Sequence, residues 1–419
     1  MHIIIRKGLW AIFSALLISS SLYFIFKLNF LPFRINKIKR KMVSKKKSSM
    51  MSALFLSLGG RIGVGSIAGV ALAIYIGGPG SIFWLFVFSF LSSILAFCEV
   101  VLANKYKIKN SDGYYYGGPS YYLKYGLNKK IIGMLYAIIL LFSYVFGFTG
   151  IQANTITLSI GNYFNISKYL IALILSIITF LIIIGGTRKV MKFSSIIVPF
   201  MSLLYIISSL IIILININKL PSSIALIIQS AFNIKPFFSS FIPMIIIGIQ
   251  RGIFSSEAGI GTCAVSSCAT DDTNLVRQGL IQMFGIYISI FICIVTALVI
   301  LLCGNFDSLN GISVINNIFH KSFGVIGDLI ILISIILFSF STILTGFYYG
   351  ESSLKFLDNS SKNSWLKVFT IVSVFIGSIM REDKIWNLVD TLISILAIIN
   401  LTALLLLRKE IFNELDYDK

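Results

Sequence analysis

Two glycine-rich segments inside long apolar runs contain the residues of this sequence that could bind a small polar solute. The first covers residues 59–69 (GGRIGVGSIAG) and the second covers residues 252–261 (GIFSSEAGIG). A helix in lipid has no water to satisfy backbone N–H and C=O groups that lose their partners. An interruption is therefore tolerated only where the open backbone faces protein or a water-filled cavity. Paired interruptions in the two halves of a chain indicate the binding site of a secondary transporter.

The first segment could bind both a negatively charged and a positively charged group. If the helix unwinds there, several backbone N–H groups become free, and the positive end of the next half-helix, from about Ile67, points at them. Such a pocket suits a carboxylate. The carbonyls of Gly59 and Ile62 would face the other way and suit a small cation. The carboxylate-binding candidates are Gly63, Val64, Gly65 and Ser66.

The alternative for these glycines is close packing of helices. Gly65 and Gly69 have the small-xxx-small spacing that lets two membrane helices approach each other. A glycine cluster that recurs in the second half of the chain favours a break over simple packing.

The second segment contains Phe254-Ser255-Ser256-Glu257. Its backbone carbonyls could receive an ammonium group, and Phe254 could cover the pocket. Glu257 is a carboxylate deep in an apolar region, which indicates a function by default. It could equally hold the loosened backbone together or pair with Arg251. Other intramembrane polar residues are Glu99, Gln152, Asn154, Asp390 and Asn400.

The composition is that of an integral membrane protein. The chain has 419 residues, of which 57% are hydrophobic and 12% charged, and its mean hydropathy is +0.93. A soluble protein of this length needs more polar surface. The net charge of +19 does not indicate nucleic-acid binding, because the basic residues gather in short loops. The five cysteines lie in apolar stretches without metal-ligand spacing and are interpreted as small core residues.

Apolar runs of about 20 residues predict eleven membrane helices. The run near the N-terminus is too long for a signal peptide and lacks a cleavage site, so we expect it to be retained. The predicted spans cover residues 9–30, 51–76, 81–102, 131–160, 169–184, 193–217, 241–268, 280–302, 325–349, 365–380 and 385–407.

The distribution of basic residues predicts the orientation. Eight of the fourteen residues at 34–47 are Lys or Arg, and the side of that loop carries 24 of the 35 basic residues. Because the richer side faces the cytoplasm, the N-terminus is predicted outside and the C-terminal tail inside. The loop itself is interpreted as a topology signal that also attracts anionic headgroups.

Without the N-terminal helix, ten spans remain, and they divide into two sets of five. Each set begins with a broken helix. Since five spans reverse direction, the two sets have opposite topologies, as in inverted-repeat transporters. The predicted parts are residues 1–50 (extra helix and basic loop), 51–217 (first repeat), 218–407 (second repeat) and 408–419 (cytoplasmic tail).

Several collinear segments resemble the alanine/glycine:cation symporter family. They include residues 60–106 with Gly-Gly-Pro-Gly, residues 112–126 (DGYYYGGPSYYLKYG), and residues 152–154 (Gln-Ala-Asn). Residues 250–262 (QRGIFSSEAGIGT), residues 276–280, residues 340–344 (FSTIL) and residues 348–351 (Tyr-Tyr-Gly-Glu) continue the match. The last helix, with Trp386, Asp390 and Asn400, is similar to the family's as well.

The resemblance implies an all-α, LeuT-like fold of five plus five inverted helices with one extra N-terminal helix. It also implies import of alanine or glycine driven by a sodium gradient or, in some members, by protons. The substrate carboxylate would meet Gly63, Val64 and Gly65, and Gln152 would line the pocket. The residues implied for the ammonium group are Gly252, Ile253, Phe254 and Ser255. Those implied for a sodium ion are Gly59, Ile62, Ser341 and Thr342.

Two positions depart from the common family form. Ser66 stands where the family has Asn, and a hydroxyl reaches less far than an amide. Gly346 stands where the family has Trp, which would enlarge the pocket if that face lines it. The amino-acid class is therefore better supported than alanine itself.

Arg61 lies beside the first break. One hypothesis is that its guanidinium takes the place of a cation and makes transport less dependent on sodium. The alternative, which we favour, is an arginine that snorkels to the cytoplasmic side or pairs with an intramembrane acid.

We expect a symporter of small neutral amino acids in the plasma membrane of a prokaryote, with Na⁺ as the coupling ion and no ATPase subunit. No Walker motif occurs. The alternatives are a proton-coupled or cation-independent carrier of altered specificity, and a non-transporting sensor or channel on the same scaffold. No Ser/His/Asp or His-metal constellation suggests an enzyme.

Overall fold

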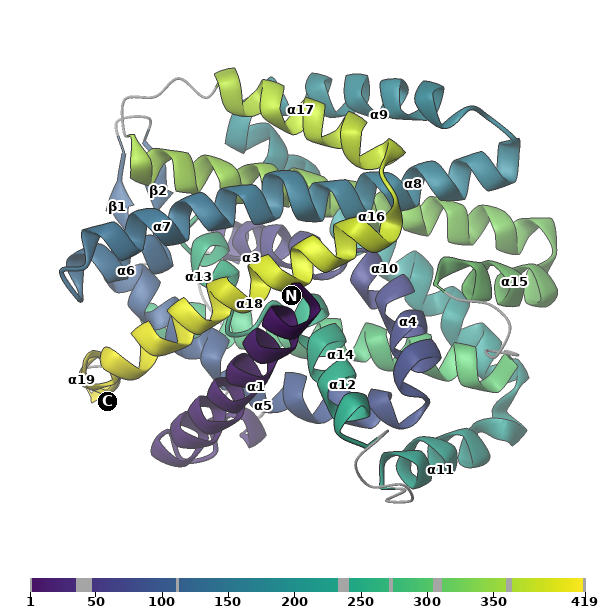
Figure 1. The fold of residues 1–419 in the computed structure, drawn as a ribbon, viewed down its shortest axis with the longest axis horizontal. Coiled ribbons are helices and arrows are strands. Elements are labelled where there is room, and N and C mark those ends of the chain that lie inside the picture. The colour runs from purple at the N-terminus through teal and green to yellow at the C-terminus, as the bar shows by residue number, and fades with distance from the viewer. Residues whose placement is uncertain are drawn as a thin grey trace.

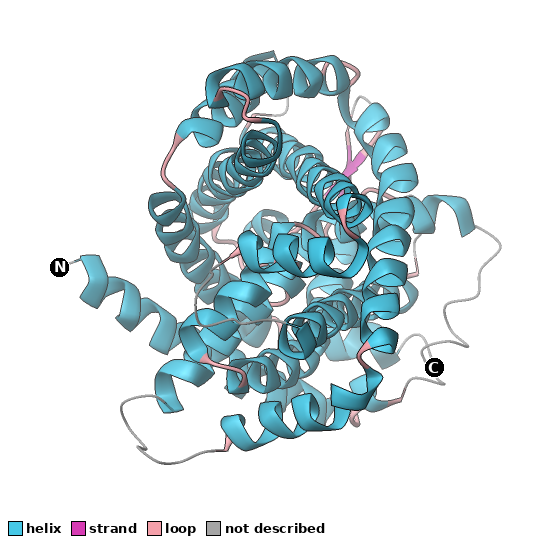
Figure 2. Ribbon diagram, turned by 90° about the vertical axis from the view of Figure 1, so that its right-hand side faces the viewer, coloured by secondary structure: helices cyan, strands magenta, loops and turns pink. Residues whose placement is uncertain are grey.

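The computed structural model describes residues 2–34, 47–110, 113–232, 241–270, 274–303, 311–358 and 364–416. Most of the basic loop predicted at residues 34–47 lies outside these ranges. The described chain is almost entirely helical, with long helices running side by side across the molecule (Figure 1). After a 90° turn, many of these helices are seen end-on and form a bundle (Figure 2).

In the first half of the chain, two predicted spans contain irregular segments. A short 3-10 turn, η2, separates α3 from α4, and a π-helical segment, η3, joins α7 to α8. The elements are α1 (His2–Lys27), η1 (Leu31–Phe33), α3 (Lys47–Arg61), η2 (Val64–Ser66), α4 (Ala68–Gly77), α5 (Gly80–Lys105), α6 (Pro119–Tyr125), α7 (Lys130–Leu141), η3 (Phe142–Phe148), α8 (Thr149–Phe164), α9 (Lys168–Ile183) and α10 (Gly186–Ile215).

The second half contains one long helix, α16, and a second interrupted helix made of α12 and α13. Its elements are η4 (Ile217–Lys219), α11 (Leu220–Ala231), α12 (Ile242–Ser256), α13 (Thr262–Ser267), α14 (Leu275–Cys303), α15 (Ile312–Phe323), α16 (Val325–Leu357), α17 (Ser364–Ile379), α18 (Glu382–Leu406) and α19 (Arg408–Asp416). Strands β1 (Ile108–Lys109) and β2 (Tyr115–Tyr116) form a small antiparallel pair between α5 and α6.

Each of the eleven predicted spans coincides with helix in the structure. Within the described residues, seven helical stretches are long and apolar enough to cross a membrane, and four shorter apolar helices accompany them. The long ones are Gly8–Lys27, Gly80–Lys105, Lys130–Gly161, Lys189–Ile215, Leu275–Cys303, Val325–Leu357 and Lys384–Leu406. The short ones are Ala68–Gly77, Lys168–Ile183, Ile242–Ser256 and Ser364–Ile379.

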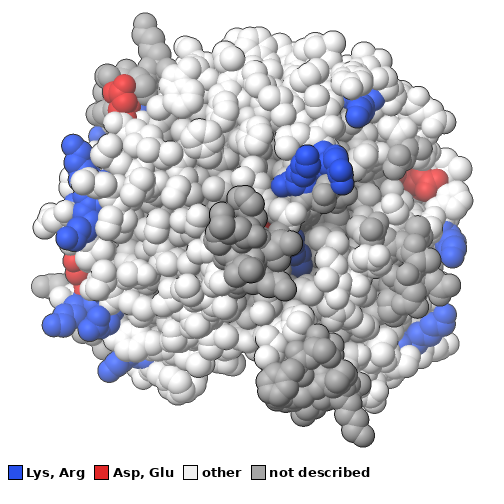
Figure 3. Space-filling view, in the orientation of Figure 1, with Lys and Arg blue, Asp and Glu red and all other residues white. Residues whose placement is uncertain are grey.

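The surface matches a protein that spans a bilayer. Most of the coloured charged side chains in Figure 3 lie toward the two ends of the long horizontal helices of Figure 1, and the surface between them is largely uncharged. On α9 and α10, Leu170, Leu181, Phe200 and Leu214 are exposed. Exposed apolar side chains on helices of this length are expected where a helix faces lipid.

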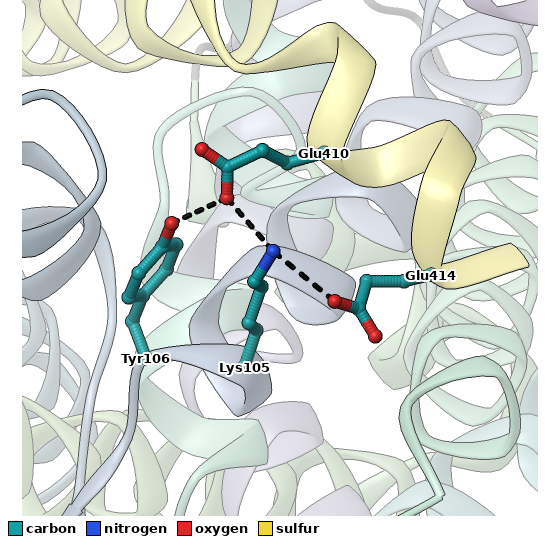
Figure 4. Close-up of polar contacts among 4 residues, drawn as sticks. All are labelled: Lys105, Tyr106, Glu410 and Glu414. Carbon is teal, nitrogen blue, oxygen red and sulfur yellow. Dashed lines mark hydrogen bonds and ion pairs between the residues drawn. The ribbon is translucent and has the colours of Figure 1, made fainter. Parts of the chain in front are cut away.

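The C-terminal helix is attached to the end of α5 by a polar cluster outside the apolar core (Figure 4). Lys105 Nζ lies 2.9 Å from Glu410 Oε2 and 3.1 Å from Glu414 Oε1. Tyr106 also donates a hydrogen bond to Glu410. Burial, and then this bond to Glu410, raise the pKa of Tyr106 to about 12. Since these groups are partly exposed, we expect the ion pairs to contribute little to stability.

Candidate functional site

The first predicted break is present. Helix α3 ends at Arg61 and α4 begins at Ala68, one residue later than predicted. Between them, Gly63 is extended (φ −108°, ψ −160°) and η2 makes a single tight turn. Short-range backbone bonds shape this turn, such as that from the Ser66 N–H to the Gly63 carbonyl at 3.1 Å. The break lies in the protein interior, with Val64, Gly65 and Ser66 all buried.

Helix α16 contacts the first break with two hydroxyl groups. Ser341 Oγ and Thr342 Oγ1 donate hydrogen bonds to the Gly59 carbonyl at 3.2 and 2.9 Å. All three residues were predicted to surround a cation, and the fold brings them together although 282 residues separate Gly59 from Ser341. Ile62 is fully buried and follows directly after the end of α3.

Helix α8 contacts the first break through Gln152. Its Oε1 accepts a hydrogen bond from the Val64 N–H at 3.1 Å. This backbone amide was predicted to be free, and in the structure it is bonded. A Cβ added to Gly63 would lie 3.2 Å from the amide group of Gln152 and even closer to Thr342 Oγ1. The backbone of Gly63 is therefore enclosed by side chains from α8 and α16, which leaves no room for a larger residue.

An aromatic stack covers the other side of the first break. A Cβ on Gly65 would lie 2.6 Å from Phe254 Cε1, so the phenyl ring rests directly on this glycine. Phe254 is itself stacked between Phe148 and Trp386, with ring centroids 4.7 Å apart in both cases. The sequence predicted Phe254 as a cover over an ammonium pocket at the second break, and in the structure its ring lies on the first break.

The second break begins five residues later than predicted. Helix α12 continues through Ser256, and the irregular segment covers only Glu257 to Gly261. Here Glu257, Gly259 and Gly261 have φ values of 55°, 84° and 105°. Positive φ is easily adopted by glycine and rarely by glutamate. The second break is thus a sharp turn of the chain between two helices.

Because the second break begins at Glu257, the residues predicted to bind the ammonium group lie in a regular helix. Gly252 is helical and packs against α5, since a Cβ there would lie 3.1 Å from the Leu85 carbonyl. The Ile253 carbonyl accepts the Glu257 N–H at 2.8 Å, and the Ser255 carbonyl accepts Ser289 Oγ at 2.8 Å. The prediction of an open backbone from Gly252 to Ser255 is wrong, because α12 continues through these residues.

Glu257 ties the second break to the surrounding helices. Tyr144 donates to its Oε1, and Thr262 donates to its Oε2, both at 2.8 Å. Tyr349 donates to Oε2 at 3.3 Å. The sequence did not identify Tyr144, Thr262 or Tyr349, although Tyr349 lies in a segment that carries the family resemblance. Of the two roles left open for Glu257, the structure supports the one that holds the loosened backbone.

Arg251 pairs with Asp390 instead of Glu257. Its Nη2 lies 2.7 Å from Asp390 Oδ2, and both side chains are almost completely buried. The guanidinium also lies 4.7 Å from the centre of the Trp386 ring, in a cation–π arrangement. The suggested Arg251–Glu257 pair is therefore wrong, because α18 provides a closer acid.

Arg61 neither snorkels nor forms an ion pair in the part of the chain that the structure describes. Its side chain is 1% exposed, and it donates to the backbone carbonyl and to Oε1 of Gln282, both at 3.0 Å. The interpretation favoured from the sequence is wrong in both forms. Gln282, on α14, offers the guanidinium two acceptors without a negative charge, while Arg61 Nε has no hydrogen-bond partner among the described residues.

The two departures from the family form lie in different surroundings. Ser66 is fully buried in the first break, and its Oγ donates to the Arg61 carbonyl at 3.4 Å. Gly346 packs against the π-helical segment, since a Cβ there would lie 3.0 Å from the Tyr144 carbonyl and 3.4 Å from Thr149 Oγ1. The expectation that Gly346 widens the pocket does not hold, because its neighbours are packed helix atoms.

The sequence as a whole matches the model of the sodium:alanine symporter family over residues 2–419. This chain belongs to that family. It is 33% identical over 377 residues to the sodium/alanine symporter AgcS of Methanococcus maripaludis, covering 87% of this chain and 83% of that protein. It is also 33% identical over 425 residues to a probable sodium/glutamine symporter, GlnT, of Bacillus subtilis, covering 98% and 89%.

Solved structures of the same fold include MhsT in complex with L-phenylalanine, with a TM-score of 0.59 at 13% identity, covering 85% of this chain and 89% of that one. An Eremococcus coleocola manganese transporter mutant matches with a TM-score of 0.56, at 13% identity over 87% and 81% of the two chains. These likenesses confirm the predicted LeuT-like fold. The family and the fold are those of multi-pass membrane transporters and not of enzymes.

Proposed function

We propose that this protein is a secondary active symporter that imports a small neutral amino acid of the alanine or glycine class together with Na⁺. Family membership supports a cation-coupled amino-acid symporter. The observation that carries the finer proposal is the first break, where α3, α8, α12 and α16 meet. There an open glycine backbone, an amide side chain and two hydroxyl groups lie together in the interior.

The substrate carboxylate would bind at the first break. Backbone N–H groups next to the start of a helix favour an anion, and Gly63 and Gly65 carry no side chain that would cover them. Gln152 now accepts the Val64 N–H, so the carboxylate would replace Gln152 as the acceptor. Ser66 would line the same turn.

The substrate would have to be small. Phe254 contacts Gly65 directly and is held in an aromatic stack, which limits the space above the first break. The ammonium group would meet carbonyl groups at the end of α12. Those of Ile253 and Ser255 are already bonded, which leaves the Phe254 carbonyl as the better candidate.

The coupling cation would bind between α3 and α16. The carbonyls of Gly59 and Ile62 and the hydroxyls of Ser341 and Thr342 provide neutral oxygen atoms, which suit a hard cation of low charge. The two hydroxyls now donate to Gly59. They would turn their lone pairs toward the ion when it binds, which requires only rotation of the hydroxyl hydrogens.

The membrane potential can drive accumulation without ATP. One positive charge that moves through 100 mV gains about 2.3 kcal/mol, which corresponds to roughly 50-fold accumulation at one cation per substrate. We further propose that the N-terminus lies outside a prokaryotic plasma membrane, and that residues 51–217 and 218–407 are the two inverted repeats.

The proposal is tested by uptake into proteoliposomes that contain the purified protein. Labelled alanine, glycine, glutamine and phenylalanine are compared under an inward sodium gradient, an inward proton gradient and no gradient. We expect concentrative uptake of alanine or glycine with the sodium gradient and little uptake of phenylalanine. Absence of accumulation for every amino acid under every gradient would overturn the proposal.

A further inference from the structure

Two fully buried carboxylates lie near the second break and differ in their hydrogen bonds. Glu257 accepts from three hydroxyl groups. Glu99, on α5, accepts one side-chain hydrogen bond, from Asn400 Nδ2 to its Oε1 at 2.7 Å. Glu99 Oε2 is buried and has no hydrogen-bond partner among the described residues. The Arg61 guanidinium acts on Glu99 only through its charge, without an ion pair in the described ranges.

An ionised carboxylate in such surroundings is costly. Burial of a charge is tolerated when the charge is paired and fully hydrogen-bonded, and otherwise the group becomes neutral. Glu257 accepts three hydroxyl hydrogen bonds, which favour its ionised form, whereas Glu99 accepts one side-chain hydrogen bond. If both were anions beside Arg61, the buried cluster would carry a net negative charge. One bound cation or proton would remove it.

A proton fits the unpartnered oxygen of Glu99. A divalent or transition-metal ion needs several charged or soft ligands at once, and the described residues contain no group of three or more His, Cys, Asp or Glu side chains that could hold one. A proton needs a single oxygen, and Glu99 Oε2 has no hydrogen-bond partner among the described residues. We propose that Glu99 is a proton-binding site and that its proton crosses the membrane with the substrate. This rests on the symport function proposed above.

Glu99 is linked to the second break through Asn400. The same Asn400 Nδ2 that donates to Glu99 also donates to the Gly259 carbonyl at 3.0 Å, and Asn400 Oδ1 accepts a bond from Tyr122. Tyr136 donates to the neighbouring Ile260 carbonyl at 2.6 Å. A movement of the second break would therefore displace Asn400, the side-chain donor to Glu99.

The contact through Asn400 suggests how Glu99 could release its proton. Glu99 lies six residues before the end of α5 at Lys105, which is about 9 Å along the helix. When the second break moves and water enters from that end, the Glu99 carboxyl gives its proton to water. The remaining carboxylate is then hydrated. Before the next cycle, Glu99 takes up a new proton from water on the opposite side of the membrane.

Glu99 faces few other groups that can change charge. Among the described residues, Arg61 is the one cation and Glu257 the one other carboxylate that interact electrostatically with Glu99. The remaining groups are phenols and thiols, whose ordinary pKa values lie above the neutral range. The titratable groups that interact electrostatically with Glu99 are Arg61, Cys98, Tyr122, Tyr136, Glu257 and Cys263.

Proton movement is measured in proteoliposomes that contain a pH-sensitive dye, with equal sodium on both sides. Addition of alanine outside should acidify the interior of wild-type vesicles. The Glu99→Gln variant keeps an oxygen for Asn400 but cannot release a proton. We expect its alanine-driven acidification to fall at least tenfold while exchange of labelled alanine continues. Glu410→Gln, the same change at the exposed end of the molecule, should acidify like the wild type.

The pH profile gives a second readout. Wild-type uptake should fall as the external pH rises, because fewer sites carry a proton, and uptake by Glu99→Gln should be flat. The inference is overturned if Glu99→Gln acidifies at the wild-type rate, or if the wild type takes up alanine without acidification. The symport proposal fails separately, when no labelled amino acid enters at all.

A chemical measurement covers the case in which Glu99→Gln does not fold. Dicyclohexylcarbodiimide reacts with protonated carboxyl groups in apolar surroundings, and mass spectrometry locates the adduct. We expect labelling of wild-type Glu99 that decreases at high pH, and no labelling of Glu257. Labelling of Glu257 in place of Glu99 would overturn the inference.

Discussion

The two broken helices look alike in the sequence and differ in how their open backbone is satisfied. At the first break, side chains from other helices, such as Gln152 and Thr342, enclose glycines that have no side chain of their own. At the second break, Glu257 and Asn400 tie the turn to its neighbours with several hydrogen bonds. We therefore propose the first break as the binding site and interpret the second as a turn held by its neighbours.

If that difference is correct, variants at the second break should mainly affect stability. Glu257→Ala leaves the hydroxyls of Tyr144, Thr262 and Tyr349 buried without their acceptor. An unsatisfied buried group costs about 1–3 kcal/mol, so we expect a loss of unfolding free energy of about 3 kcal/mol or more. Thermal unfolding of the purified protein in detergent measures it. Glu410→Ala, at a partly exposed site, is the matched control, and an equal loss in both variants would contradict the comparison.

Variants at the first break should mainly affect binding. Gly65→Ala places a methyl group against the Phe254 ring, which the aromatic stack holds in position. Overpacking of this kind costs about 1–3 kcal/mol, which corresponds to about a 5- to 150-fold loss of substrate affinity in a radioligand binding assay. At Gly69, one turn further on, the nearest atom to an added Cβ is Trp386 at 3.9 Å. Gly69→Ala should therefore bind normally, and equal losses in both variants would speak against a site at the first break.

The cation site gives a smaller effect. Thr342→Val keeps the shape of the side chain and removes the hydroxyl that contacts Gly59. Loss of one ligand to a cation, at about 1–2 kcal/mol, should raise the sodium concentration for half-maximal uptake by roughly tenfold. The control is Thr370→Val, whose hydroxyl bonds only within its own helix, to the Leu366 carbonyl. An unchanged sodium dependence in Thr342→Val would mean that the cation binds at another site.

The smallest effect is expected far from both breaks. Lys105→Ala removes the two ion pairs to α19 shown in Figure 4. Partly exposed pairs contribute about 0–1 kcal/mol, so the midpoint of thermal unfolding should change little. The small change should shrink further in high salt. A large loss of stability would mean that α19 supports the core in a way that the two breaks do not explain.

The sequence predicted the first break well and the second less well, for a physical reason. Glycine permits both an interrupted helix and close contact between helices. At Gly63 and Gly65 the chain uses the first option, and at Gly252 it uses the second, against α5. Nothing in the local sequence separates the two uses. Composition, by contrast, predicted the helical spans reliably, because a bilayer accepts only long apolar helices of this kind.

The sequence by itself determined that this is a helical membrane protein with two breaks, and which residues could bind ions and small solutes there. Only the tertiary structure decided the partners. It brought Thr342 to Gly59, Asp390 to Arg251, and Tyr144 to Glu257, over 283, 139 and 113 residues of chain. Helix packing sets these contacts, and local residue patterns do not encode which distant helices become neighbours.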